Sequence, residues 1–251
     1  MSSIAHEITR VLQPLAGLNA VLHVGLDRNV SHGRVDLLAG CVDGDIKRYA
    51  IDIICLLKSW DPSGEFSVCD DSVRFDTSAG TGGVAVCDPI ALVEGISGWI
   101  EGRMLSGQRR SWAVGYWLPE ALCGDLATAS VLHDATGIAD RVCQLVSPYP
   151  EKLSNSIVQW CSEEIRLKLV TLRSLSQAVA LVEHRLCLAD IAAALVRLAF
   201  ARGRRYLRGF RSLEQQVVFL SPADRAVYDL ASELLLGSTA ESTIERVRSV
   251  I

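Results

Sequence analysis

The spacing of hydrophobic residues divides the chain into two parts of different character. Up to about residue 115, short apolar runs alternate with Gly, Asp and Ser, a pattern that predicts strands and turns. Beyond that point Gly and Pro become rarer, and apolar residues recur with a helical period over long segments. The pattern therefore predicts an α+β protein. We expect a mixed α/β domain with a small sheet at 1–115 and a helical bundle at 116–251.

Within the first part, each apolar segment predicts one element. Residues 4–15 place their apolar side chains on one face of a helix, and 19–26 and 35–41 are predicted strands. The pair Asp43-Gly44 indicates a hairpin turn, which would make 49–57 a third strand, antiparallel to the second. A further hairpin is predicted with arms at 73–76 and 84–87. The Gly-rich residues between these arms, 78–83, can be interpreted as a turn or as a phosphate-binding loop, although they lack the lysine of a P-loop.

Helices follow from residue 88 onward. Asp88-Pro89 is typical of a helix start, and the helix is expected to extend to about Met104. Ser221-Pro222 marks another start by the same logic. The other helices of the second part are predicted at 119–132, 138–146, 150–173, 175–202, 222–235 and 240–249.

Composition narrows the classes of function. The chain has 251 residues and a formal net charge of −4, so a general attraction to nucleic acid or to an anionic membrane is not indicated. No apolar run is long enough to span a bilayer, and no basic segment followed by an apolar one opens the sequence. We therefore expect a cytoplasmic protein. The eight cysteines form no Cys-x-x-Cys pair, which favours reduced, buried thiols over a zinc site.

One segment, residues 21–38, has the layout of an active-site motif. An apolar strand leads to Gly25, a polar loop follows, and a second apolar strand carries Asp36. This layout resembles the signature of the nucleotidyltransferase superfamily, in which Gly-Ser follows one strand and Asp-x-Asp or Asp-x-Glu lies on the next. Gly25 and Asp36 match. Leu26 occupies the position of the serine, and Arg34 occupies the position of the first acid.

The second part resembles the C-terminal domain of small-molecule nucleotidyltransferases, such as the aminoglycoside and lincosamide adenylyltransferases. The matching segments lie in the order that the resemblance requires, within residues 116–222. They are Leu132-His-Asp-Ala-Thr-Gly137, Tyr149-Pro-Glu-Lys-Leu153, Glu183-His-Arg185 and Leu198-Ala-Phe-Ala-Arg-Gly-Arg-Arg-Tyr206. Each segment is short, and their order is what makes the similarity specific.

The resemblance implies a reaction that transfers a nucleoside monophosphate from a nucleoside triphosphate to a hydroxyl group of a small molecule. Two Mg²⁺ ions assist such a displacement, held by carboxylates from neighbouring strands. Asp36 would be one metal ligand, and Asp52 is the candidate for another. Alternatively, the third acid would fall on the strand at 84–87, where this sequence has none. A carboxylate from the helical domain, Glu120 or Asp125, would act as general base.

Nucleotide contacts are expected from two regions. Gly25, Leu26 and Arg34 belong to the signature, and Arg204, Arg205 and Arg208 belong to a dense basic run. These arginines either complement the end of a helix or form a phosphate clamp. Arg34 raises the main question, because a guanidinium cannot bind a metal and stays protonated. Placed two residues from Asp36 on one strand face, it would pair with that carboxylate and repel a divalent ion.

Three hypotheses follow from this sequence. The protein is an active Mg²⁺-dependent nucleotidyltransferase, related to antibiotic-modifying enzymes. Alternatively, it is a pseudoenzyme that has lost transfer activity and serves as a ligand-binding, regulatory or scaffold protein. In the third, the same fold acts on an anionic substrate with different chemistry. The expected partners are a nucleotide and a small molecule. The sequence predicts neither the acceptor nor the oligomeric state.

Overall fold

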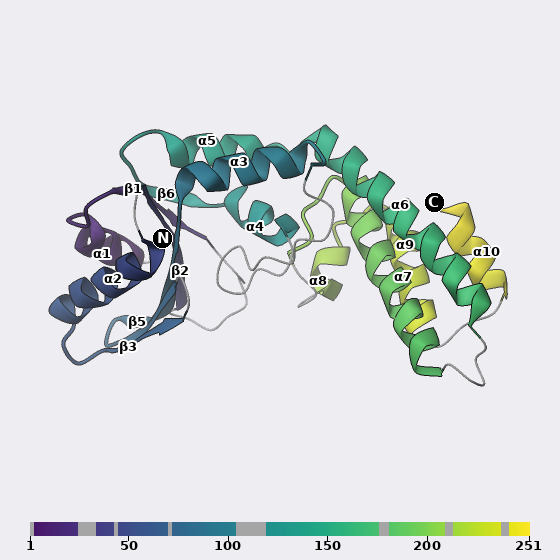
Figure 1. The fold of residues 1–251 in the computed structure, drawn as a ribbon, viewed down its shortest axis with the longest axis horizontal. Coiled ribbons are helices and arrows are strands. Elements are labelled where there is room, and N and C mark those ends of the chain that lie inside the picture. Colours follow the sequence, from purple (N-terminus) through teal and green to yellow (C-terminus); the bar gives the residue numbers. More distant parts are fainter. Residues whose placement is uncertain are drawn as a thin grey trace. The chain divides into compact units, whose positions relative to one another are not determined.

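The computed structural model describes residues 3–24, 34–42, 45–69, 72–103, 119–175, 181–208, 213–236 and 241–251. The chain forms two compact units. The first comprises residues 1–98 and 108–148, and the second comprises 99–107 and 149–251. A mixed sheet with helices makes up the first unit, and the second is helical (Figure 1). The predicted α+β class is confirmed. The predicted Asp43-Gly44 turn lies outside the described residues.

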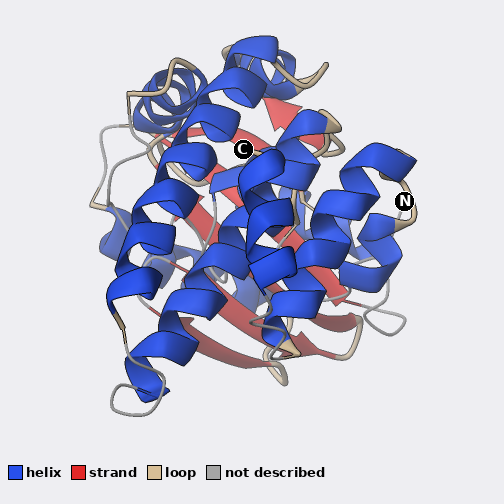
Figure 2. Ribbon diagram, turned by 90° about the vertical axis from the view of Figure 1, so that its right-hand side faces the viewer, coloured by secondary structure: helices blue, strands red, loops and turns tan. Residues whose placement is uncertain are grey.

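The first unit is built on a six-stranded sheet with the order β3-β4-β5-β2-β1-β6. The strands lie side by side in Figure 2, where they are drawn in red. The central pair, β2 and β5, is parallel, and all other neighbours are antiparallel. The strand bounds are β1 Leu18–His23, β2 Arg34–Cys41, β3 Glu65–Cys69, β4 Ser72–Thr77, β5 Gly80–Cys87 and β6 Ser130–Asp134.

Helices α1 (Ser3–Leu12) and α2 (Ile46–Trp60) pack on one face of this sheet. Alternate residues of β2, namely Val35, Leu37 and Ala39, share a hydrophobic core with both helices. The helix predicted at 4–15 is thereby confirmed. The odd-numbered positions of β2 define the face that these helices cover, because side chains alternate along a strand.

The prediction of a third strand at 49–57 is wrong, because this segment lies within α2. Asp45 caps the helix by accepting a hydrogen bond from the Lys47 amide at 3.0 Å. Ala50, Ile53 and Leu57 are buried at a helical spacing. The almost continuous apolar run 53–57 concealed that spacing, since short apolar runs do not distinguish a strand from a buried helix.

The hairpin predicted from 73–76 and 84–87 is confirmed as β4 and β5. Its turn consists of Ser78 and Ala79, which confirms a turn at the start of the Gly-rich segment, whereas Gly80, Gly82 and Gly83 belong to β5. Asp61 at the end of α2 holds this turn, because its carboxylate accepts hydrogen bonds from the Ser78 amide at 3.1 Å and the Ser78 hydroxyl at 3.2 Å. Strand β3 pairs with β4 from a polar segment in which we predicted no strand.

Three more elements complete the first unit. Helix α3 (Pro89–Ile100) begins where predicted, with Asp88 accepting from the Ile90 amide at 2.9 Å. Helix α4 (Pro119–Leu126) ends earlier than the helix predicted at 119–132, because 130–134 forms β6 and pairs with β1. This pairing joins segments about a hundred residues apart, so local periodicity could not indicate it. Helix α5 (Ile138–Val146) packs against β1 and β6 and has the predicted bounds.

The second unit confirms the predicted helical bundle. Its long central helix, α7, buries residues around much of its circumference and packs against α6 and α9. Ser221 caps α9, as its sequence predicts, by accepting from the Asp224 amide at 3.2 Å. The helices are α6 Glu151–Ser174, α7 Leu181–Arg202, α8 Leu213–Val217, α9 Pro222–Leu235 and α10 Glu241–Ser249; α8 had not been predicted.

The two remaining expectations concern membranes and cysteines. Among the described helices, none is both long and apolar enough to cross a membrane. All eight cysteines are free thiols. Cys41, Cys123, Cys161 and Cys187 are buried as expected, whereas Cys55 and Cys69 are exposed.

Candidate functional site

Asp36 lies on the face of the sheet opposite α1 and α2. Its neighbours Val35 and Leu37 are 1 % exposed and belong to the core beneath those helices, so the half-buried side chain of Asp36 points the other way. Arg34, at the start of β2, shares this face because it is two residues before Asp36. The side chain of Arg34, like all of Gly25 and Leu26, lies outside what the structure describes.

The register of β2, β5 and β4 sets the neighbours of Asp36. Asp36 lies opposite Gly83 of β5, and Gly83 lies opposite Arg74 of β4. One step along the strands, Arg34 lies opposite Thr81, and Thr81 lies opposite Asp76. Both β4 residues are exposed. In sequence terms, each of the two aspartates has an arginine two positions away on its own strand: Arg34 before Asp36 on β2, and Arg74 before Asp76 on β4.

In the described parts of β2 and β5, Asp36 is the one carboxylate on this face. On the side of Asp36, β5 presents Thr81, Gly83 and Ala85, none of which is acidic. The alternative position for a third acid, on 84–87, is thus empty of carboxylates as the sequence indicated. Across the described parts of the chain, no three His, Cys, Asp or Glu side chains gather to hold a metal ion. The described residues of this face therefore do not by themselves make up the metal pair of a nucleotidyltransferase.

Asp52 is not a neighbour of Asp36. It was expected on a strand antiparallel to β2, but it lies half-buried on α2. Because α2 packs on the face formed by Val35 and Leu37, the sheet itself separates Asp52 from the face to which Asp36 points. The geometry gives no support to a metal site shared by the two aspartates.

The two candidate general bases, Glu120 and Asp125, both lie on α4. Their side chains are only 3 % and 2 % exposed, and every residue from Glu120 to Leu126 is buried. Carboxylates are almost never buried so completely unless they are paired. Burial also raises the pKa of the Cys123 thiol on this helix, an effect that the charge of Glu120 reinforces. Their assignment as general bases stays a prediction.

His23 lies at the end of β1, next to the signature. Burial lowers its pKa, while the negative charge of Asp36 acts in the opposite direction and His6 of α1 lowers it further. The net effect keeps the imidazole neutral near pH 7, since the ordinary pKa is 6.5. His23 is itself half-buried rather than part of the core.

Two of the segments that resemble small-molecule nucleotidyltransferases meet in the second unit. The rings of Tyr149 and Tyr206 pack with their centroids 4.5 Å apart. Two residues before Tyr206, Arg204 forms an ion pair of 2.9 Å with Glu151. A third segment, 132–137, forms the end of β6 and the turn into α5, where Asp134 accepts from the Asp140 amide at 3.0 Å. The sequence matches therefore correspond to packing and turn positions.

The basic run at the end of α7 makes separate contacts within the helical unit. Arg202 donates to the backbone oxygen of Val250 at 2.5 Å, and the guanidinium of Arg205 lies 5.4 Å from the ring centre of Phe219. Arg204 adopts a positive φ of 50° as the helix ends. These contacts favour the structural interpretation of the run. Nucleotide binding by Arg204, Arg205 and Arg208 stays a prediction.

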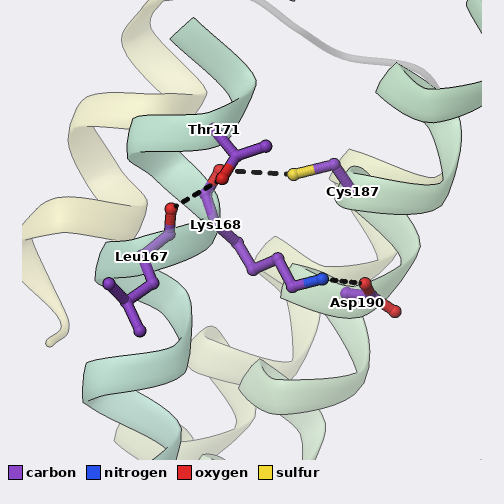
Figure 3. Close-up of polar contacts among 5 residues, drawn as sticks. All are labelled: Leu167, Lys168, Thr171, Cys187 and Asp190. Atoms are coloured by element: carbon purple, nitrogen blue, oxygen red, sulfur yellow. Dashed lines mark hydrogen bonds and ion pairs between the residues drawn. The ribbon is translucent and has the colours of Figure 1, made fainter. Parts of the chain in front are cut away.

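A cluster of charged side chains between α6 and α7 was not predicted from the sequence. Lys168 of α6 forms an ion pair with Asp190 of α7, and this contact raises the pKa of the lysine (Figure 3). The Cys187 thiol donates to the Lys168 backbone oxygen at 3.2 Å. Nearby, burial raises the pKa of Glu164, opposed by the charge of Arg197. Arg197 in turn lies over the ring of Trp160 at 4.3 Å. These contacts join the two long helices.

Comparison with known proteins supports the fold alone. No protein-family model matches the sequence, and no curated protein matches it either. Among solved structures, a nucleotidyltransferase-like protein from Exiguobacterium sibiricum 255-15 is similar, with a TM-score of 0.51 at 12 % sequence identity. The match covers 98 % of this chain and 71 % of the other. The chain therefore has a nucleotidyltransferase-like fold over almost its whole length.

Proposed function

We propose that this chain is a nucleotidyltransferase-fold protein that has lost metal-dependent nucleotidyl transfer and serves as a ligand-binding or regulatory protein. The observation that carries this proposal is the register of β2, β5 and β4. Gly83, which carries no side chain, lies opposite Asp36 on β5, and the exposed Arg74 lies opposite Gly83 on β4. The fold is thus that of a transferase, whereas the charges on its sheet face differ from those that the reaction uses.

The electrostatic argument is direct. Mg²⁺ binds hard oxygen ligands and depends on carboxylates together with phosphates. A guanidinium remains charged at any relevant pH and offers no lone pair. At an effective dielectric of 20, two unit charges 4 Å apart interact by about 4 kcal/mol, so a divalent ion near an arginine would meet repulsion of at least that order. Asp36, the one carboxylate that the described parts of β2 and β5 present on this face, cannot offset such a term and also orient two ions.

An active transferase is the competing function. Its support is the fold, which hosts that chemistry in other proteins, but a fold does not by itself determine function. Such an enzyme needs further carboxylates beside Asp36, and the described residues of β2 and β5 do not provide them on this face. The third possibility is different chemistry on an anionic substrate. Like the proposal, it needs no metal on this sheet face, but it predicts that the substrate is turned over.

The test is an assay of pyrophosphate release from ATP and GTP. It is run with hydroxyl-bearing acceptors of the aminoglycoside and lincosamide classes, with Mg²⁺ and with EDTA. The proposal predicts no release above the background without protein in either condition. Mg²⁺-dependent release that disappears in an Asp36→Asn variant would overturn it and establish the transferase.

A further inference from the structure

Packing within the described chain does not require a glycine at position 83. It lies inside β5 with no left-handed φ, and a Cβ atom built on it would meet its nearest neighbours, Asp36 Oδ1 and the Val73 backbone oxygen, at 3.5 Å. That is ordinary van der Waals contact. The adjacent Gly82 is different, because its Cβ would lie 1.9 Å from the Val35 backbone oxygen. Packing thus explains Gly82 and leaves Gly83 unexplained.

A glycine inside a strand weakens the sheet, by roughly 0.5–1 kcal/mol relative to alanine. Such a residue often marks a place where another group approaches the backbone closely. Among the described residues, Asp36 and Val73 alone have atoms within 4 Å of this position, so the described chain supplies no such group. The open side of Gly83 is therefore suited to a ligand.

The groups beside Gly83 define the chemistry of that ligand. Arg74 is exposed on β4 directly opposite Gly83, and its guanidinium can donate paired hydrogen bonds to an oxyanion. Asp36, on the other side, accepts hydrogen bonds from hydroxyl or amino groups. Neighbouring strands are about 4.8 Å apart, so Arg74 and Asp36 start roughly 10 Å apart across the glycine. A small molecule with an anionic end and a hydroxyl-bearing end spans such a distance.

We propose that the sheet face over Gly83 binds a small phosphorylated, hydroxyl-bearing molecule without a divalent metal, with Arg74 holding the phosphate and Asp36 the hydroxyl groups. This inference rests on the proposed function, because a metal-dependent site would need acids where this face has arginines. In this proposal the guanidinium of Arg74 supplies the positive charge that metal ions would otherwise supply. A sugar phosphate and a nucleotide share this chemistry.

The experiment is calorimetric titration of the full chain in EDTA with three probes: ribose 5-phosphate, AMP and inorganic phosphate. Preference for AMP identifies a nucleotide as the source of the phosphate, and equal affinity for the first two identifies the sugar phosphate. We expect both to bind more tightly than inorganic phosphate. Arg74→Met and Gly83→Val should each weaken binding at least about tenfold, the size expected for a lost charge-assisted hydrogen bond or a blocked seat.

Arg10→Met is the matched control, since it removes an equal charge from an exposed position on α1 and should leave affinity unchanged. Melting curves establish that each variant folds; the Cβ atom of Gly83→Val meets no described atom closer than 3.5 Å and Arg74 is exposed, so we expect both variants to fold. The inference is wrong if none of the probes binds. It is also wrong if Arg74→Met and Gly83→Val bind the probes as tightly as the wild type does. Those outcomes leave the proposed loss of transfer intact, because it is tested separately by pyrophosphate release.

Discussion

Asp36 and Gly83 lie directly opposite each other on the two parallel strands at the centre of the sheet, and a Cβ atom on Gly83 would lie 3.5 Å from Asp36 Oδ1. Nucleotidyl transfer by two metals needs several carboxylates close together. Here the strand position opposite Asp36 is a glycine, which contributes no side chain. Our two proposals, the loss of metal-dependent transfer and the binding of a ligand over Gly83, both start from this relationship.

Rebuilding the acids should create a metal site. Arg34→Asp combined with Gly83→Asp would place three carboxylates on one face of adjacent strands, because residues 34, 36 and 83 share that face. In EDTA the double variant should melt below the wild type, since the new charges repel. Mn²⁺ should restore its stability, by about 2.7 kcal/mol at a hundred times the dissociation constant. Differential scanning calorimetry with and without Mn²⁺ measures this.

The matched control for that variant is Arg34→Asp combined with Ala79→Asp, which adds the same charges but places one in the exposed β4–β5 turn. It should show no stabilisation by Mn²⁺. Equal responses of the two double variants would mean that Gly83 does not lie beside Asp36 as described.

The neighbouring glycines should respond differently to alanine. Gly82→Ala places a methyl group 1.9 Å from the Val35 backbone oxygen and 2.5 Å from the Phe75 ring, so the strands must separate. We expect a loss of about 1–3 kcal/mol in the free energy of unfolding, as for other overpacked sites. Gly83→Ala should be neutral or slightly stabilising. Urea denaturation of both variants provides the comparison, and a larger loss for Gly83→Ala would contradict the assignment of the two faces.

Asp61 should stabilise the protein in a pH-dependent way. Hydrogen bonds from Ser63 above all, and from Ser78, lower the pKa of its carboxyl below the ordinary value of 3.8. The folded state therefore favours the ionised form. This contribution is complete above the unfolded pKa and is lost as the pH falls through the lower folded pKa. Thermal melts of wild type and Asp61→Asn should differ at pH 7 and converge as the pH falls below the folded pKa of Asp61; a constant difference would show that ionisation is irrelevant.

His23 should report the charge of Asp36. That charge raises the pKa of the imidazole against the larger effect of burial, so Asp36→Asn should lower the pKa of His23 further. Proton NMR titration of the histidine resonances measures the change, with Asp52→Asn as a control of equal charge on α2. A pKa that is unchanged in Asp36→Asn would contradict the electrostatic link between β1 and β2.

Local patterns were enough to predict much of the fold. The spacing of apolar residues and the caps at Asp88 and Ser221 located most helices, and the hairpin of β4 and β5 followed from its turn. Errors arose where tertiary pairing decides. The segment 49–57 forms a helix because its apolar residues face the sheet core, and 130–134 forms a strand because β1 accepts it as an edge partner.

The candidate site was only partly predictable. The sequence placed Asp36 on a strand and indicated that Arg34 disrupts the signature, but it assigned Asp52 to the wrong kind of element. Arg74 and Gly83 were not found because they become neighbours of Asp36 only through the register of β2, β5 and β4. A mid-strand glycine beside an exposed arginine was the available signal, and it becomes meaningful only when the strand pairing is known.

The central claim is that no divalent metal takes part in ligand binding at this fold's sheet face. The most direct measurement is the calorimetric affinity of the wild-type chain for ATP and GTP, in EDTA and in excess Mg²⁺. The account predicts that Mg²⁺ does not strengthen binding of either nucleotide. A Mg²⁺-dependent gain of tenfold or more, about 1.4 kcal/mol, that is lost in Asp36→Asn would contradict it.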